Sequence, residues 1–442
     1  MSDESRSSPG HVTRRGALAL GGAAFLAGCG VPGDLLGSEP VELDGPKLRL
    51  VTSREGPTVP RPFPVEVAGS HVTASRDRAY AMLDAVPLPL TADEMANGAM
   101  RDEIAEHAER ARSRLSEAIE APSVRERLER LADARGSARV AEGTWAAAND
   151  ELSAAAVRAN RRTTREAIDA FRENWAYVGD DDVVRALLVH DLVEEWAASA
   201  RTGIEPDDRH VEGVVNALVV GERAGSVEGA RATLADAEHV GQRFRESLSD
   251  ARSLRSTFAD ARDSLSSTIE SRMADVPPES ADLNGQLDAN LDETVAGFAL
   301  KDLHGDLPTG DEIARTDGLA VTVLGQIEGI ARLGAFETLY GRIESGDHRT
   351  VEGIEDVEAL RAAAVTAVED ALAASADDRL ARTVLATLSG WFDYAERQLS
   401  ELGDSVELSR AARDLALYVA LETIAAATPA AVDEGLAALG VE

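Results

Sequence analysis

The sequence predicts an all-α fold, a helical bundle preceded by an extended N-terminal segment with minor β structure. Apolar residues recur every three or four positions from Thr91 to about residue 440, and polar capping residues or prolines separate the runs. One long stretch, residues 226–274, follows a seven-residue repeat that is typical of coiled coils. Alternation typical of strands is confined to two short stretches, residues 47–50 and 65–67.

A short apolar stretch lies near the N-terminus. From Gly16 to Gly28 it contains 13 residues, all of them Gly, Ala, Leu or Phe. This is shorter than the roughly 20 residues of a membrane-spanning helix and is typical of the apolar region of a secretory signal. Arg14 and Arg15 precede the stretch, and it ends in Leu26-Ala27-Gly28 followed by Cys29.

These residues resemble the signal of a twin-arginine-exported lipoprotein, a resemblance limited to residues 13–30. It implies a signal peptide over residues 1–28 and a lipid on the sulfur of Cys29, which would anchor the chain in the cell membrane, facing outside. Two lipid chains on one residue give stable anchoring, whereas one is marginal. The alternative is a chance apolar N-terminus with a buried structural cysteine. Because Cys29 is the only cysteine, the sequence offers no second thiol for a disulfide.

Residues 29–90 are expected to form a lipid-attached tether. Residues 30–70 are rich in proline and glycine, including PTVPRPFP at 57–64, and lack helical periodicity. The alternating residues at 47–50 and 65–67 allow short strands. The segment would hold the folded part of the chain away from the membrane.

A first helical domain is predicted over residues 91–275. Thr91 and Glu94 form a capping pattern for a helix that Pro122 interrupts, and Asp180 to Asp182 provide an acidic cap for another at 183–200. Further helices are expected over 123–140 and 149–177. At 226–274 the heptad pattern contains one extra step of three residues, and an unbroken helix of these 49 residues would be about 75 Å long. Such a rod needs other helices of this chain or a second chain along its length.

Residues 276–310 are expected to be a domain boundary or a loop that crosses a single bundle, because Pro277 and Pro278 end the long helix. A C-terminal helical domain follows over residues 311–442. Its last helix is predicted to begin at Thr428, with Pro429 in the first turn.

The chain is strongly acidic, with 79 Asp and Glu against 45 Lys and Arg and a net charge of −34. This composition, with only two lysines, resembles that of proteins from salt-accumulating haloarchaea, whose surfaces gain from screening by salt. A hydrophobic content of 44% is too high for an acidic disordered protein. Nucleic acid is an unlikely partner because no segment is basic, and contact with the membrane would depend on the lipid of Cys29.

No catalytic constellation stands out. His190 and Glu194 lie one helical turn apart and could hold a metal if another helix supplied ligands, although solvated or ion-paired side chains are the commoner outcome in so acidic a chain. Motifs for zinc proteases, serine nucleophiles and phosphate loops are absent, and the sequence predicts no cofactor. Two aromatic groups, RENWAY at 172–177 and GWFDYAER at 390–397, are expected to be core anchors or, less commonly, the lining of a pocket.

The sequence therefore favours a lipid-anchored, extracytoplasmic helical binding or scaffold protein at the cell surface of a halophile. A protein partner, or self-association through the helices, would be expected. The alternative function is a solute- or metal-binding lipoprotein associated with transport.

Overall fold

The computed structural model describes residues 41–441 except 205–215, 279–280, 288–290 and 309–317. The predicted all-α class is confirmed, because helices dominate the described residues and the strands are two or three residues long. The elements before residue 250 are β1 (Glu42–Asp44), α1 (Gly45–Thr52), α2 (Gly69–Asp84), α3 (Gly98–Glu120), α4 (Val124–Ala148), α5 (Ala154–Glu173), β2 (Val178–Gly179), α6 (Val183–Gly203) and α7 (Ala217–Ser247).

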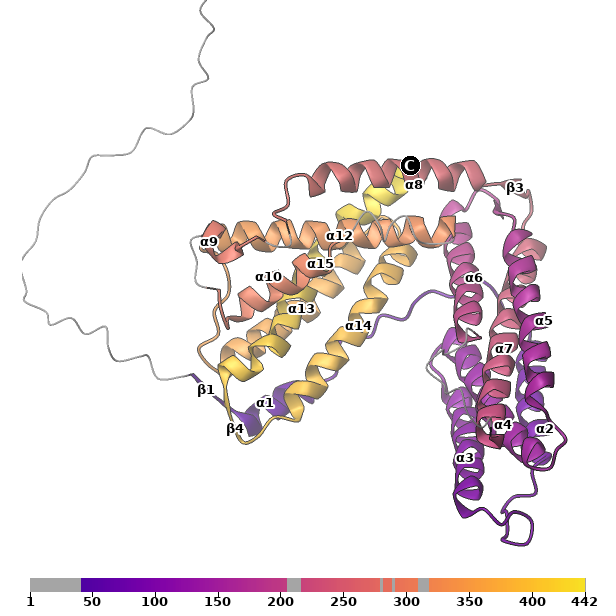
Figure 1. Ribbon diagram of the computed structural model, residues 1–442. Helices are drawn as coiled ribbons and strands as arrows, with labels where there is room; N and C mark the ends of the chain where they lie inside the picture. Colours follow the sequence, from indigo (N-terminus) through magenta and orange to yellow (C-terminus); the bar gives the residue numbers. More distant parts are fainter. Residues whose placement is uncertain (1–40, 205–215, 279–280, 288–290, 309–317, 442) are drawn as a thin grey trace, which may run out of the picture. The chain divides into compact units, whose positions relative to one another are not determined.

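The remaining elements follow α7, and no single helix spans residues 226–274 (Figure 1). They are β3 (Arg252–Ser253), α8 (Arg255–Met273), α9 (Leu283–Leu287), α10 (Val295–Gly305), α12 (Leu319–Glu344), α13 (Ile354–Ala374), α14 (Asp378–Ser400), β4 (Ser405–Glu407) and α15 (Leu408–Ala438). The strands form two antiparallel pairs, β1 with β4 and β2 with β3.

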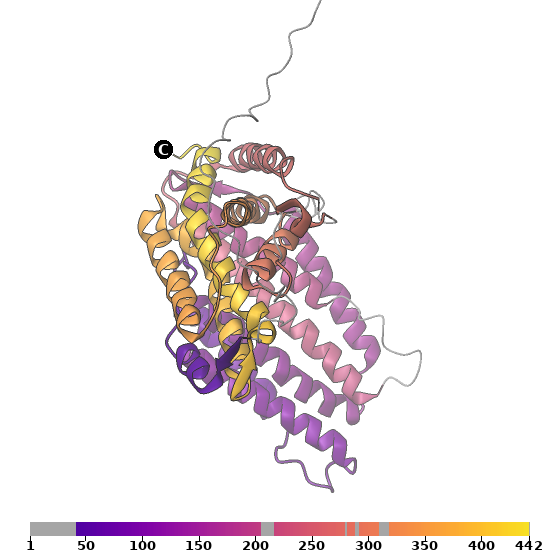
Figure 2. The ribbon, with the colours of Figure 1, turned by 90° about the vertical axis from the view of Figure 1, so that its left-hand side faces the viewer.

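The first bundle consists of α2 to α7, with α7 against α4, α5 and α6 (Figure 2). Glycines bring α4 and α7 very close together. A Cβ atom at Gly221 would lie 2.0 Å from Thr144 Oγ1 and 2.8 Å from the carbonyl oxygen of Val140, and one at Gly225 would lie 2.8 Å from the carbonyl oxygen of Gly136. Only a residue without a side chain permits this backbone approach.

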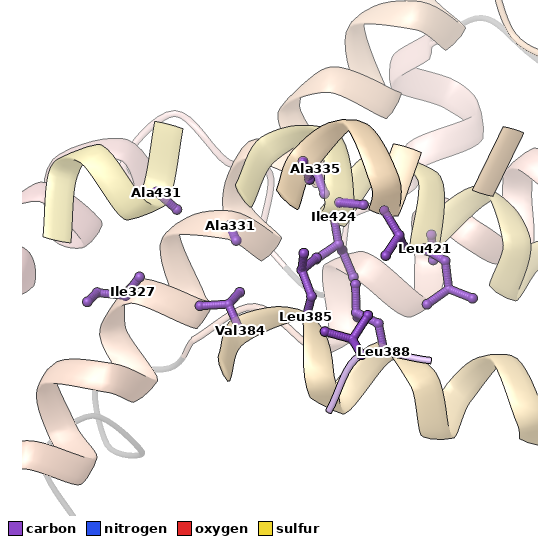
Figure 3. Packing of buried hydrophobic residues seen from close by; sticks show 14 of the residues in the cluster. Ile327, Ala331, Ala335, Val384, Leu385, Leu388, Leu421, Ile424 and Ala431 are labelled. Atoms are coloured by element: carbon purple, nitrogen blue, oxygen red, sulfur yellow. The ribbon is translucent and has the colours of Figure 1, made fainter. Parts of the chain in front are cut away.

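The second bundle consists of α8, α10 and α12 to α15, with α15 against α8, α10, α12, α13 and α14. Apolar side chains from α12, α14 and α15 meet in its core (Figure 3), where the labelled residues are Ile327, Ala331, Ala335, Val384, Leu385, Leu388, Leu421, Ile424 and Ala431. Among the described helices, α12 and α15 are long and apolar enough to cross a membrane, but 67% of each apolar window is buried inside the protein. Both helices therefore act as core helices of this bundle.

The N-terminal segment is folded onto both bundles, so the predicted tether is wrong for residues 41–90. Residues 47–50, whose alternation allowed a short strand, lie in α1, whose Leu48 is fully buried against the second bundle. Asp44 caps this helix by accepting a hydrogen bond from the amide of Lys47. The minor β structure expected here is present as β1, whereas residues 65–67 form no strand. Residues 29–40 lie outside the described residues.

Residues 53–68, called the crossing segment below, run without helix or strand from the second bundle to the first (Figure 1). The amide of Val59 donates to Ser389 Oγ on α14 at 3.3 Å. The carbonyl oxygen of Pro64 accepts from Arg185 Nε on α6 at 3.1 Å, and Phe63 packs against Trp196 of the same helix. The segment thus connects the two bundles by side-chain and backbone contacts.

The predicted continuous helix over 226–274 is also wrong. The helical stretch ends at Ser247 and resumes at Arg255. In between, Ser253 pairs with Val178, and the amide of Leu254 donates to the carbonyl oxygen of Tyr177 at 2.9 Å. These tertiary hydrogen bonds replace the helical ones, and α8 packs with the second bundle against α12 and α15. The division between bundles therefore lies near residue 250, and not at 276–310.

Smaller differences concern helix ends. The helix expected at Thr91 begins at Gly98, capped by Asn97, whereas Thr91 and Glu94 hydrogen-bond to each other in a turn. The last helix does not begin at Thr428, because α15 runs through Pro429 without a break and the Thr428 hydroxyl donates to the carbonyl oxygen of Ile424. The acidic cap at Asp182 is confirmed, since its side chain accepts from the amide of Arg185.

Candidate functional site

A pocket of about 350 Å³ lies where α5 and α6 meet the start of α12, and we call it the interface pocket. Its size falls in the range of small-molecule sites. The chain leaves α5 at Asn174 and passes into β2, which places two aromatic side chains of the RENWAY group at the pocket. The lining residues are Phe171, Arg172, Trp175, Tyr177, Val193, Glu194, Glu195, Ala197, Ala198, Gly318 and Val321.

Glu194 caps the first turn of α12 from the neighbouring helix α6. Its carboxylate accepts hydrogen bonds from the Tyr177 hydroxyl and from the amide of Val321, the latter at 2.9 Å. The amide of Leu319 donates to the same hydroxyl at 3.2 Å. The positive end of the helix dipole favours a carboxylate at this point. Burial nevertheless raises the pKa of Glu194, against the effect of these hydrogen bonds.

The close fit at this cap also requires a glycine. A Cβ atom at Gly318 would lie 2.2 Å from Glu194 Oε2. Any side chain there would displace the carboxylate from the start of α12. The position of the Glu194 carboxylate therefore depends on a glycine at residue 318.

His190 lies behind the pocket wall, in the apolar core. Its side chain is fully buried among the rings of Trp175, Tyr177, Phe244 and Phe258. Its Nε2 donates to the carbonyl oxygen of Val178 at 2.8 Å, while Nδ1 has no hydrogen-bond partner in the described part of the chain. Burial lowers the pKa of His190 to about 4, so the ring is neutral at ordinary pH.

The structure does not bring His190 and Glu194 together as a metal pair. His190 bonds to β2 and Glu194 bonds to Tyr177 and α12. Among the described residues, no group of three or more His, Cys, Asp and Glu side chains is arranged to hold a metal ion. The spacing of one helical turn is present, but the partners of the two side chains are different.

Two sequence families match successive parts of the chain. Residues 70–250 match the family described as a domain of unknown function (DUF8262), and residues 255–435 match a second domain of unknown function (DUF8264). No curated protein and no solved structure matches the chain. The families meet at the break between α7 and α8, and the interface pocket takes residues from both.

An ion-pair network lies on the same helix face, beside the pocket. Arg61 of the crossing segment donates to Asp191 at 2.6 Å and to Glu195 at 3.2 Å, and Arg125 of α4 also pairs with Glu195. Burial raises the pKa of Asp191 to about 7, and the Arg61 guanidinium opposes this shift. The network holds the crossing segment and α4 against α6. Sequence reasoning missed it because Arg61 lies in a proline-rich stretch with no local sign of a partner.

The other residues that the sequence predicted as site residues lie in different parts of the chain. Arg14, Arg15 and Cys29 lie outside the described residues. Trp175 and Tyr177 are buried, as expected of core anchors, and they also line the interface pocket. The buried indole nitrogen of Trp175 has no hydrogen-bond partner among the described residues.

Proposed function

We propose that the chain is a lipid-anchored, extracytoplasmic solute-binding protein of a halophile, and that it holds a small, mainly apolar ligand in the interface pocket. The observation that carries this proposal is the pocket itself, which is walled by Phe171, Trp175 and Tyr177 at the junction of the two family regions. Ligand sites occur preferentially at such domain junctions and are lined by apolar side chains with a few polar groups.

The polar groups of the pocket leave little for a ligand to bind. The Trp175 indole nitrogen has no hydrogen-bond partner among the described residues, but it is fully buried and so is not open to a ligand. Glu194 is already engaged by Tyr177 and α12. A bound ligand would therefore gain most from the apolar walls.

A scaffold function has less support because the heptad positions of α7 are covered within the chain. Val227, Leu234, Ala237 and Phe244 are buried against neighbouring helices. These side chains are therefore not available for contact with a second chain.

Ligand binding is tested with the neutral fluorophore 1-aminoanthracene, titrated into the full chain at high salt. We expect saturable binding to one site. Ala198→Trp should abolish it, because Ala198 is exposed and lines the pocket. Ser199→Trp is the matched control, as the next residue is exposed and outside the lining. Equal binding by all three proteins would contradict the proposed pocket.

Anchoring is tested separately through Cys29. In a host with twin-arginine export, the wild-type chain should fractionate with membranes, and Cys29→Ser should be released from them. Mass spectrometry should find a lipid-modified residue 29 at the N-terminus. An intact Met1, or an unmodified thiol at residue 29, would overturn this part of the proposal.

A further inference from the structure

A second and larger hollow lies in the second bundle, far along the sequence from the residues of the interface pocket. It has a volume of about 740 Å³ and lies between the end of α10, the middle of α14 and the first half of α15, where Leu417 and Ala420 contribute apolar surface. We call it the α15 groove. It shares Gly305, Asp306 and Trp391 with an adjoining hollow of about 450 Å³ beside α12.

Three of the charged side chains that line the groove lack a counter-ion among the described residues. Asp302, Arg413 and Asp414 line it, and among the described residues none of them has a counter-ion within 4.0 Å. Partial burial raises the pKa values of Asp302 and Asp414, and the positive charge of Arg413 opposes both shifts. Lys301 at the edge is different, because it already pairs with Asp292 at 3.3 Å. The groove thus holds carboxylates and a guanidinium that are close enough to influence one another but do not pair.

Two aromatic side chains lie on one wall of the α15 groove. Trp391 and Tyr394 are three residues apart on α14 and therefore share a face of that helix. Tyr394 is 49% exposed, an unusual position for a large aromatic ring in this chain. Among the described residues, neither the Trp391 indole nor the Tyr394 hydroxyl has a hydrogen-bond partner. Both residues belong to the GWFDYAER group at 390–397, which does not line the interface pocket.

The aromatic rings and carboxylates of the groove suit the positive group of a zwitterion, and the guanidinium of Arg413 suits its negative group. Ring faces next to carboxylates attract organic cations, and a guanidinium binds a carboxylate through two parallel hydrogen bonds. A purely anionic ligand would meet the repulsion of Asp302, Asp306 and Asp414, and a metal cation would meet that of Arg413. A neutral polyol would leave the charges of the groove unpaired.

We propose that the α15 groove binds a free α-amino acid, with its ammonium group at Asp302 and Asp414 against the aromatic wall and its carboxylate on Arg413. This site is separate from the interface pocket, so either one can fail without the other. It adds a second, polar ligand class to the proposed function.

The test is isothermal titration of the full chain with each of the common L-amino acids at high salt. At least one should bind to a single site and change the tryptophan fluorescence, and Trp391→Phe should remove that change. Arg413→Ala and Asp414→Asn should each weaken binding at least about tenfold. Arg410→Ala is the matched control, an exposed arginine on the same helix outside the groove lining, and should bind as the wild type does.

Ligand derivatives identify the chemistry. The N-acetyl derivative of the bound amino acid lacks the ammonium charge, and its amide lacks the carboxylate, so both should bind at least about tenfold more weakly. The proposal is overturned if no amino acid binds, if the derivatives bind equally well, or if Arg413→Ala has no effect. Binding of glucose in place of amino acids would also overturn it. Far-ultraviolet circular dichroism of each variant checks that the fold is retained.

Discussion

The two bundles reach a packed interior by different means. In the first bundle, glycines draw α4 and α7 together, and the acidic side chains of Glu228 and Asp236 are buried, Glu228 paired with Arg135 and Asp236 in contact with His71. In the second, apolar side chains of α12, α14 and α15 fill the core (Figure 3), and this core continues into apolar residues of α6 and α7. Among its described residues, Arg361 is the buried charge, paired with Glu396 at 2.8 Å.

This difference has a physical consequence. The stabilisation from a close backbone contact or a buried ion pair depends on one or two atoms. The stabilisation from an apolar core is spread over many side chains. The first bundle should therefore respond strongly to changes of charge, pH and glycine, and the second to the loss of apolar volume. Four predictions test this comparison, in order of decreasing effect.

Glu228→Ala should lower the free energy of unfolding by about 4 kcal/mol. Glu228 pairs with Arg135 at 2.7 Å and with Arg78 at 3.4 Å, so its loss leaves the mainly buried guanidinium of Arg135 without a partner. Urea unfolding followed by circular dichroism measures the change. Glu106→Ala, which breaks an exposed pair with Arg110, is the control and should cost less than about 1 kcal/mol. Equal losses would show that burial of the charge is unimportant.

Leu385→Ala should cost about 3 kcal/mol, because it leaves a cavity in the core between α12, α14 and α15. The same unfolding experiment applies. Leu50→Ala removes the same atoms from a leucine that is 65% exposed and should change the free energy little. If the two variants were equally stable, the apolar core would not carry the second bundle.

Gly221→Ala should cost about 2 kcal/mol, because the new methyl group has no space between α7 and α4. Gly341→Ala provides the opposite case in α12. No atom other than the nearby backbone of its own helix lies within 4 Å of its Cβ position, so the change should stabilise the helix by up to about 1 kcal/mol. Thermal melts of the two variants should move in opposite directions, and a shift in the same direction would contradict the close contact.

His190 should make stability fall in weak acid. Its pKa is about 4 in the folded protein and near 6.5 when exposed, so between these values the unfolded chain binds more protons. Stability from this residue is therefore complete above pH 6.5 and declines by about 1 kcal/mol on lowering the pH to 5.5. His190→Gln should lack this component, seen as a smaller difference between urea midpoints at pH 7 and 5.5. An unchanged difference would contradict the buried neutral ring.

The sequence was informative where local patterns decide the structure. Helical periodicity predicted the fold class, and Asp182 predicted the start of α6. The break after Ser247 had only a weak sign, the extra step of three residues from Ala251 to Leu254, because residues 248–254 contain neither glycine nor proline. Pairing with β2, more than 70 residues earlier, ends the helix there.

The candidate sites show the same limit. Spacing identified His190 and Glu194, but their partners come from β2 and α12, which no local pattern indicates. The aromatic groups around Trp175 and Trp391 were visible in the sequence as rare residues in a chain with 4% aromatic content. Their proximity to open pockets depends on how distant helices pack, and only the structure gives that.

The path of the N-terminal segment affects how the protein can be dissected. Strand β1 pairs Leu43 with Val406, and Leu48 and Val51 cover apolar surface of the second bundle before the crossing segment leads to the first. A fragment cut at residue 255 would lose this cover and expose a strand edge, a common cause of aggregation. Soluble expression of the second family region alone should therefore require residues 41–68, supplied as a fused or added peptide.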